Sequence, residues 1–230
     1  MDFIVESLRT AFALILSFDG EVFNTVGTSL TISSVAIVIA TLISVPIGIV
    51  IALNQFTGKT FCLTILNTLM ALPTVVVGLV VYGFLSRQGP LGQFGLLFTP
   101  GAMIIGQVIL ATPIVTNYTL AAVVGSDPRI LPTAQTLGAG PLTGIMVLIK
   151  EIRFGIMAAL IAGFGRIVAE VGVAMMLGGN IRGYTRTMTT AIALETSKGE
   201  FAFGLALGLI LLGVALAINI FLNFLQQRSR

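Results

Sequence analysis

The chain has 230 residues, of which 56% are hydrophobic and only 9% are charged, with a net charge of +3 and a mean hydropathy of +1.06. A soluble domain carries about 25% charged residues, so this composition predicts an integral membrane protein. One cysteine and no histidine exclude an internal disulfide and the commonest metal-ligand and general-base chemistry, and the scattered basic residues argue against nucleic-acid binding.

The first 20 residues, MDFIVESLRTAFALILSFDG, predict a short helix that lies in the membrane interface. Glu6 and Arg9 interrupt the apolar run too early for a span of about 20 residues. The stretch also lacks the basic start and the small-residue cleavage site of a secretory signal. An amphipathic segment of this kind is typical of interfacial helices.

Five later stretches are long and apolar enough to cross a membrane. They cover about residues 25–53, 61–85, 100–124, 154–177 and 201–225. Each of the first three stretches contains a proline, which leaves a backbone carbonyl without its helical hydrogen bond. Membranes tolerate such unpaired backbone groups only where they are buried in protein or line a water-filled cavity. We therefore predict an all-α, polytopic membrane protein of one domain, residues 1–230, with five transmembrane helices after the N-terminal interfacial helix.

An odd number of spans places the two termini on opposite sides of the membrane. With the N-terminus outside, six basic residues fall in cytoplasmic segments: Lys59, Arg129, Lys150, Arg153, Arg228 and Arg230. Five then fall outside: Arg9, Arg87, Arg182, Arg186 and Lys198. This small excess points in the direction of the positive-inside rule, but the charges alone leave the orientation open.

Two ionisable residues lie inside a predicted span. Arg166 and Glu170 are four residues apart in GFGRIVAEVG, so they share one helix face and can form an ion pair. Charges at membrane depth are costly and usually face a bundle interior or an aqueous path. The pattern fits both a pair that only holds helices together and a pair beside a translocation path or gate.

No catalytic or metal-binding constellation is present in the sequence. It contains no HExxH, no Ser–His pairing and no GxxxxGK[ST] phosphate loop. A channel subunit would usually show a filter motif, and a secondary transporter would often show an internal repeat and intramembrane ion ligands. Neither is evident, although both remain as remote alternatives. The sequence therefore predicts a conduit that is not an enzyme and that is driven from outside this chain.

The segment between the third and fourth spans, residues 125–153, contains PTAQTLGAGPLTGIMVLIKE. It resembles the cytoplasmic loop of permease subunits of ATP-binding-cassette (ABC) importers, which carry EAA, three residues and then glycine. Alignment on Gly138 places residues 132–134 at the EAA positions, and TLGA at 136–139 matches the strongest part of the pattern. Pro132 replaces the acidic residue of that motif, and residues 150–151 are Lys-Glu where Leu-Pro is expected.

Two further stretches extend the resemblance over nearly the whole chain from about residue 24. ALPTVVVGL at 71–79 and AEVGVAMMLGGNIRGYTRTMTTAI at 169–192 resemble permeases for molybdate, tungstate and sulfate, and the variant ending in IALETSKGEF is most similar to tungstate-type permeases. The resemblance implies the type I ABC importer permease fold. It also implies import of an oxyanion across a prokaryotic inner membrane, most consistently tungstate, with molybdate or sulfate as alternatives.

The same resemblance implies a set of partners and an orientation. The permease would form a homodimer in membrane lipid, with separate ATPase subunits that hold ATP–Mg and an extracytoplasmic substrate-binding protein. The chain itself would bind no cofactor, metal or nucleic acid. Because residues 125–153 form the cytoplasmic coupling loop in the family, the N-terminus is expected outside and the C-terminus inside.

Candidate site residues follow from this reading. A short coupling helix from about Thr133 to Thr143 is expected on the ATPase, with contacts at Thr133, Ala134, Gln135, Leu137, Gly138, Ala139, Gly140 and Pro141. A path for a dianion needs polar walls that do not bind it tightly. The candidate residues for the translocation path or its gate are Thr74, Thr112, Thr116, Asn117, Arg166 and Glu170. Arg182 and Arg186, on the external side, are candidates for contact with the binding protein or for local structure.

Overall fold

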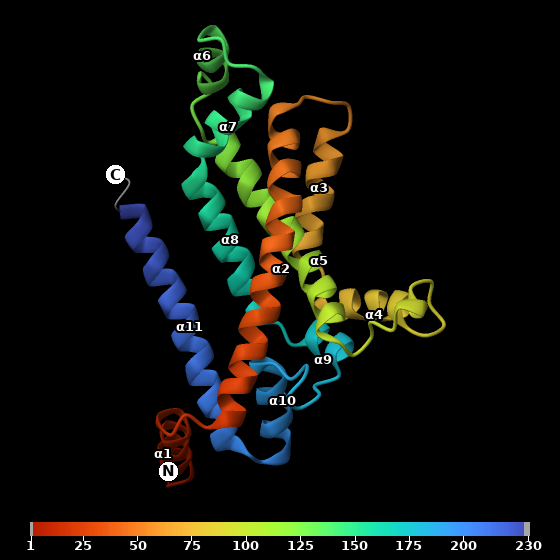
Figure 1. Cartoon of the computed structure of the whole chain (residues 1–230), viewed down its shortest axis with the longest axis vertical. Coiled ribbons are helices and arrows are strands. Elements are labelled where there is room, and N and C mark those ends of the chain that lie inside the picture. Colours follow the sequence, from red (N-terminus) through yellow and green to blue (C-terminus); the bar gives the residue numbers. More distant parts are fainter. Residues whose placement is uncertain (1, 228–230) are drawn as a thin grey trace.

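The computed structural model describes residues 2–227 and folds them into eleven α-helices and one short 3-10 helix (Figure 1). No strand occurs among these described residues, and the predicted all-α fold is confirmed. Met1 of the predicted interfacial helix lies outside the description. So do Arg228 and Arg230, which the charge comparison counted on the cytoplasmic side.

The N-terminal helices begin where local sequence signals place them. Helix α1 (Asp2–Leu16) ends before a turn, and α2 (Gly20–Leu53) starts at Asp19, whose side chain accepts hydrogen bonds from the backbone N–H groups of Glu21 and Val22 at 3.0 Å each. With 34 residues at about 1.5 Å each, α2 is about 51 Å long. It exceeds the hydrocarbon core of a bilayer, which is about 30 Å thick.

Two of the predicted spans are broken rather than continuous. Helices α3 (Lys59–Met70) and α4 (Thr74–Leu85) meet at 97°, and α8 (Arg153–Val168) and α9 (Gly172–Gly178) meet at 63°. Pro73 causes the first break because it has no N–H to continue α3 and suits the start of α4. In the described chain, three single helices are long and apolar enough to cross a membrane. The number of spans rises to five when each bent pair is counted as one span.

The core forms where α2 packs along α5 (Pro100–Val124). Small residues allow these two helices to approach closely. A Cβ on Gly48 of α2 would lie 2.9 Å from the backbone oxygen of Thr116 and 2.9 Å from the Cβ of Thr119. The hydroxyl of Ser44 also donates a hydrogen bond to the carbonyl of Thr112 at 3.1 Å. The α2–α5 pair is therefore the tightly packed frame on which α3, α4, α8, α9, α10 and α11 lie.

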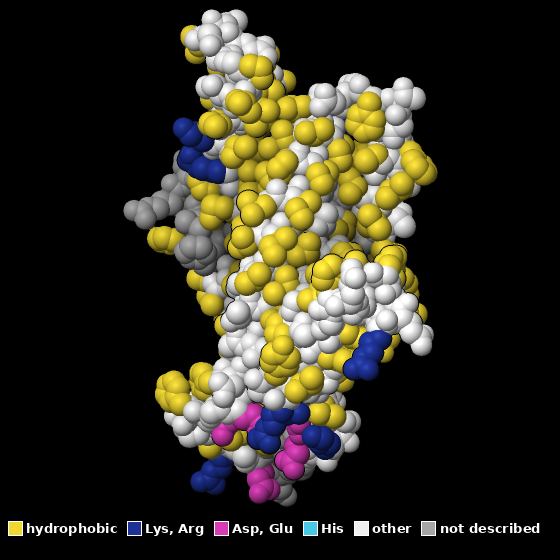
Figure 2. Space-filling view, turned by 45° about the vertical axis from the view of Figure 1, so that its right-hand side comes forward, with side chains coloured by type: hydrophobic (Ala, Val, Ile, Leu, Met, Phe, Trp, Pro, Cys, Tyr) yellow, Lys and Arg dark blue, Asp and Glu magenta, His cyan; other side chains and the backbone are white. Residues whose placement is uncertain are grey.

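Other elements lie at the two ends of this frame (Figure 1). One end carries α6 (Ile130–Thr136) and α7 (Pro141–Glu151). The opposite end carries α1, α10 (Met188–Lys198) and the start of α11 (Phe201–Gln227), which runs back toward α6 and α7. In Figure 2 the acidic side chains gather at the α1–α10 end, beyond an apolar belt that covers the middle of this face.

The predicted single helix over Thr133–Thr143 is wrong. Helix α6 ends at Thr136, and the next helix begins at Pro141. Gly138 takes a φ of +86°, a left-handed conformation that ends helices, and its N–H donates to the carbonyl of Gln135. The segment therefore forms a helix–turn–helix hairpin, because glycine stops the first helix and proline starts the second.

Candidate functional site

The α6–α7 hairpin projects from one end of the bundle (Figure 1). Few of its side chains are buried, namely Ala134 of α6 and Leu148 of α7, and Leu148 packs in a cluster with Ile49 of α2 and Val123 of α5. The two helices pack against each other, and Gly144 of α7 lies beside Leu131 of α6. The hairpin is thus a compact unit held to the spans by a small apolar contact.

The outer surface of the hairpin carries an apolar ridge, which we define as Leu137, Leu142 and Met146. These side chains are 82%, 75% and 62% exposed. Most of the predicted coupling residues lie around the ridge and are exposed: Thr133, Gln135, Leu137, Gly138, Gly140 and Pro141. Ala134 is buried and Ala139 is half-buried. Exposed apolar side chains gathered on a projecting element are typical of a protein-docking surface.

An exposed ion pair stands at the start of the hairpin. The Arg129 guanidinium lies 2.7 Å from the Asp127 carboxylate, and the hydrogen bonds from Arg129 hold the pKa of Asp127 below its ordinary value of 3.8. The stabilisation that this ion pair gives to the folded state is fully present above the ordinary pKa of Asp127. It is lost only as the pH falls through the lowered pKa of the folded state. Asp127 therefore stays ionised throughout the physiological range.

The second region of interest is the break between α8 and α9, where Glu170 has both carboxylate oxygens engaged. Oε2 accepts from the Arg166 guanidinium at 2.7 Å. Oε1 accepts from the N–H of Gly172 at 2.8 Å and of Val173 at 3.4 Å, and so caps the first turn of α9. The Thr189 hydroxyl donates to the Glu170 carbonyl at 2.7 Å. The predicted pairing of Arg166 with Glu170 is confirmed, and the same carboxylate also shapes the bend.

The start of α4 lies against the start of α9. A Cβ on Gly172 would be 3.0 Å from the Thr74 hydroxyl oxygen and 3.3 Å from Oε1 of Glu170. One turn further along, a Cβ on Gly78 would be 3.0 Å from the Met176 sulfur. The two helix breaks therefore meet, and Thr74 and Glu170 are brought to one place in the bundle.

Three other candidate path residues lie elsewhere. Thr116 is completely buried in the α2–α5 packing, so it lines no open path in this structure. Thr112 is half-buried, and its hydroxyl donates to the carbonyl of Val108. Asn117 is half-buried, and its amide contacts the Met70 sulfur at 3.0 Å. The hydrogen bonds given for Thr112 and Asn117 do not reach the α8–α9 break.

Sequence reasoning missed a residue that supports this break. Gln107 of α5 is 2% exposed, and its amide donates to the carbonyl of Ile167 at 3.3 Å, in the last turn of α8. A buried glutamine in an apolar helix was the available signal, because such a group needs a hydrogen-bonding partner. Its partner is 60 residues away in sequence, so only the fold reveals it.

The two external arginine candidates have different surroundings. Arg186 is nearly buried, and its guanidinium lies 3.1 Å from Glu21 and 3.3 Å from Glu195. Arg182 also pairs with Glu21, but its side chain is 69% exposed. Lys198 completes the cluster at 3.1 Å from Glu195. Arg186 thus joins the start of α2 to α10, whereas Arg182 presents a charge at the surface.

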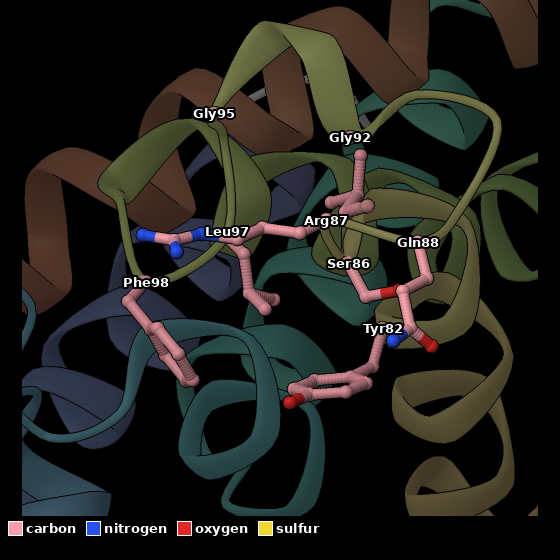
Figure 3. Close-up of a pocket in the computed structure, with 9 residues that line it drawn as sticks. Tyr82, Ser86, Arg87, Gln88, Gly92, Gly95, Leu97 and Phe98 are labelled. Atoms are coloured by element: carbon pink, nitrogen blue, oxygen red, sulfur yellow. The ribbon is translucent and has the colours of Figure 1, made fainter.

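A glycine-rich loop after α4 borders a pocket of about 620 Å³ (Figure 3). It includes η1 (Gly92–Phe94). Tyr82 and Phe98 form part of its wall with ring centroids 6.3 Å apart, and the Arg87 side chain extends toward Phe98. The pocket belongs to the loop at the far end of α4, away from the helix breaks.

The chain matches the family described as "Binding-protein-dependent transport system inner membrane component" over residues 44–230. It is 40% identical to the tungstate uptake system permease protein TupB of Peptoclostridium acidaminophilum, across 99% of this chain and 100% of that protein. It is 41% identical to the protein of the same name from Campylobacter jejuni, across 99% of this chain and 95% of that protein.

One similar solved fold comes from a bacterial alginate ABC transporter crystallised with its alginate-bound periplasmic protein. It has a TM-score of 0.76 and 20% identity, and the match covers 100% of this chain and 89% of that one. At this level of identity the likeness concerns the fold, which is that of type I ABC importer permeases.

Proposed function

The chain belongs to the binding-protein-dependent inner membrane transport components, and we propose that it is the permease subunit of an ABC importer that carries tungstate into the cytoplasm. The observation that carries this proposal is the 40% identity to a tungstate permease over the full length of both chains. Molybdenum permeases of Azotobacter vinelandii and Escherichia coli reach only 29%, so molybdate is the second candidate. A channel or a secondary transporter has no support among these relatives.

The α6–α7 hairpin is the proposed coupling element. It projects from the bundle and exposes the apolar ridge of Leu137, Leu142 and Met146, which supports docking to a separate ATPase subunit. The hydrolysis of ATP–Mg would take place on that subunit, so this chain acts as a translocation subunit. Because the family loop faces the cytoplasm, this proposal places the N-terminus outside and the C-terminus inside.

The remaining partners follow from the same assignment. A second copy of the chain completes the path, and an extracytoplasmic binding protein delivers the anion at the α1–α10 end. Arg182 is the better candidate for contact with that protein, since its side chain is exposed. Arg186 is committed to two glutamates inside the subunit and is assigned to local structure.

Uptake in a reconstituted system tests the substrate. The permease, its ATPase and its binding protein are placed in proteoliposomes, and tungstate accumulation is measured by elemental analysis with ATP present. We expect ATP-dependent uptake that excess tungstate suppresses and that equal amounts of molybdate or sulfate suppress less. Equal suppression by molybdate would reassign the substrate, and ATP-independent uptake would remove the importer assignment.

The orientation is tested with introduced cysteines. Replacing the single Cys62 with serine gives a cysteine-free background, to which Ser17→Cys near α1 or Thr136→Cys at the end of α6 is added. Both positions are exposed in the structure. A membrane-impermeant maleimide should label Ser17→Cys in intact cells and Thr136→Cys only after the membrane is opened. The reverse pattern would overturn the orientation.

A further inference from the structure

The two sides of α8 differ in the size of their side chains. Met157, Leu160 and Phe164 line an apolar groove of about 500 Å³ that α11 also borders. The accessible side that carries Arg166 instead presents small residues, Ala162, Gly165 and Ala169. These four follow one another at spacings of three, one and three residues, so they lie on one face of the helix. A charge at membrane depth faces protein or water rather than lipid, so this small-residue side is the one that faces away from lipid.

Arg166 has hydrogen-bonding capacity that the described residues do not use. Its guanidinium carries five N–H donors, and Glu170 is the one acceptor that the structure gives it. The side chain is 42% exposed. The remaining donors of this planar group therefore lie beside Glu170 at the α8–α9 break, and tetrahedral oxyanions match such a fork with two parallel hydrogen bonds.

Glu170 is fixed in place beside this cation. Its side chain is 4% exposed, one oxygen holds Arg166, and the other caps α9. Because the carboxylate is anchored to the backbone of α9, it cannot move away when an anion approaches the guanidinium. The nearby negative charge lowers the affinity of Arg166 for any further anion. A weak site is what transport requires, since tight binding would prevent release.

We propose that Arg166 is the intramembrane contact for the translocated oxyanion dianion, and that Glu170 keeps this contact weak. The inference rests on the proposed oxyanion importer function and assigns its path to the α8–α9 break. It also separates the two charges: Arg166 attracts the substrate, whereas Glu170 positions the arginine and opposes retention.

Direct binding to the permease–ATPase complex, without the binding protein, tests this assignment. Glu170→Gln removes the negative charge while its amide oxygen still accepts from the α9 backbone. Equilibrium dialysis against tungstate should show binding at least about tenfold tighter for Glu170→Gln than for wild type, equivalent to about 1.4 kcal/mol. Arg166→Gln should show none above background. The matched control is Arg87→Gln, an exposed arginine away from the breaks, which should bind like wild type.

Transport supplies the second measurement. With loaded binding protein, Arg166→Gln should lower tungstate uptake per ATP hydrolysed by about tenfold, and Arg166→Lys, which keeps the charge, should restore part of it. Glu170→Gln should slow the release of tungstate from Arg166 relative to wild type. If Glu170→Gln binds no tighter than wild type, or Arg166→Gln keeps the wild-type ratio, the assignment is wrong. If the wild-type importer moves no tungstate at all, the proposed function fails instead.

Discussion

Gly138 offers a test of the hairpin that depends on backbone conformation alone. Its φ of +86° is left-handed, and no heavy atom lies within 4 Å of where a Cβ would stand. Gly140, two residues later, is equally open, but its φ is −68°. Serine at both positions therefore makes the same chemical change in the same empty space, and only the conformational cost differs.

The left-handed conformation costs a residue with a Cβ about 1–2 kcal/mol. If the turn between α6 and α7 must keep its shape for docking, Gly138→Ser should weaken ATPase binding by about five- to thirtyfold. Gly140→Ser should leave binding unchanged or slightly tighter, because serine at this position caps α7. Gly138→Asn should fall between them, since asparagine tolerates this conformation.

The assay is titration of the ATPase onto the permease in nanodiscs, followed by tungstate-stimulated ATP hydrolysis in the full importer. Insertion and yield serve as controls for folding. Equal affinities for Gly138→Ser and Gly140→Ser would refute the reasoning, because they would show that the left-handed turn has no part in docking.

Three other substitutions test packing, charge and the ridge. Gly48→Ala brings a Cβ within 2.9 Å of α5 and should cost about 1–3 kcal/mol, seen as a lower thermal midpoint; Gly27→Ala, in open space, should not. Arg186→Gln removes the nearly buried cation that Glu21 and Glu195 share, which leaves them only the more exposed Arg182 and Lys198, and should destabilise by about 2–3 kcal/mol. The exposed Arg182→Gln should stay within about 1 kcal/mol; denaturation of the solubilised permease compares them. If docking buries the Leu137 side chain, that burial contributes about 2 kcal/mol to binding. Leu137→Ser should then lower the affinity for the ATPase, measured by titration, about thirtyfold, and an unchanged affinity would remove Leu137 from the docking surface.

Local patterns were sufficient for several features of the fold. The apolar stretches identified the spanning helices, because the bilayer itself sets their length. The pairing of Arg166 with Glu170 followed from their spacing of four residues and is present at 2.7 Å. Gly138 and Pro141 both lie inside the single helix predicted over Thr133–Thr143, and that prediction is wrong because glycine ends one helix and proline starts the next.

Contacts between distant segments were beyond the reach of such patterns. Thr116 reads as a polar residue suited to a path, but helix packing against Gly48 buries it completely. Arg186 reads as a surface charge, but its partner Glu21 is 165 residues away. In both cases the face that a helix turns inward depends on its neighbours, and a periodicity argument within one apolar helix does not specify it.

The sequence by itself determined that this is a multi-pass membrane protein with a small-residue loop of the ABC permease type, because composition and local motifs carry that information. The tertiary structure decided where the chain bends within the membrane and what meets at the bends. Pro73 and Glu170 stand far apart in the sequence, and the bends of 97° and 63° place the helices they begin against each other. That juxtaposition arises from packing between segments, and it is what places Arg166, Glu170 and Thr74 as candidates for the path of the anion.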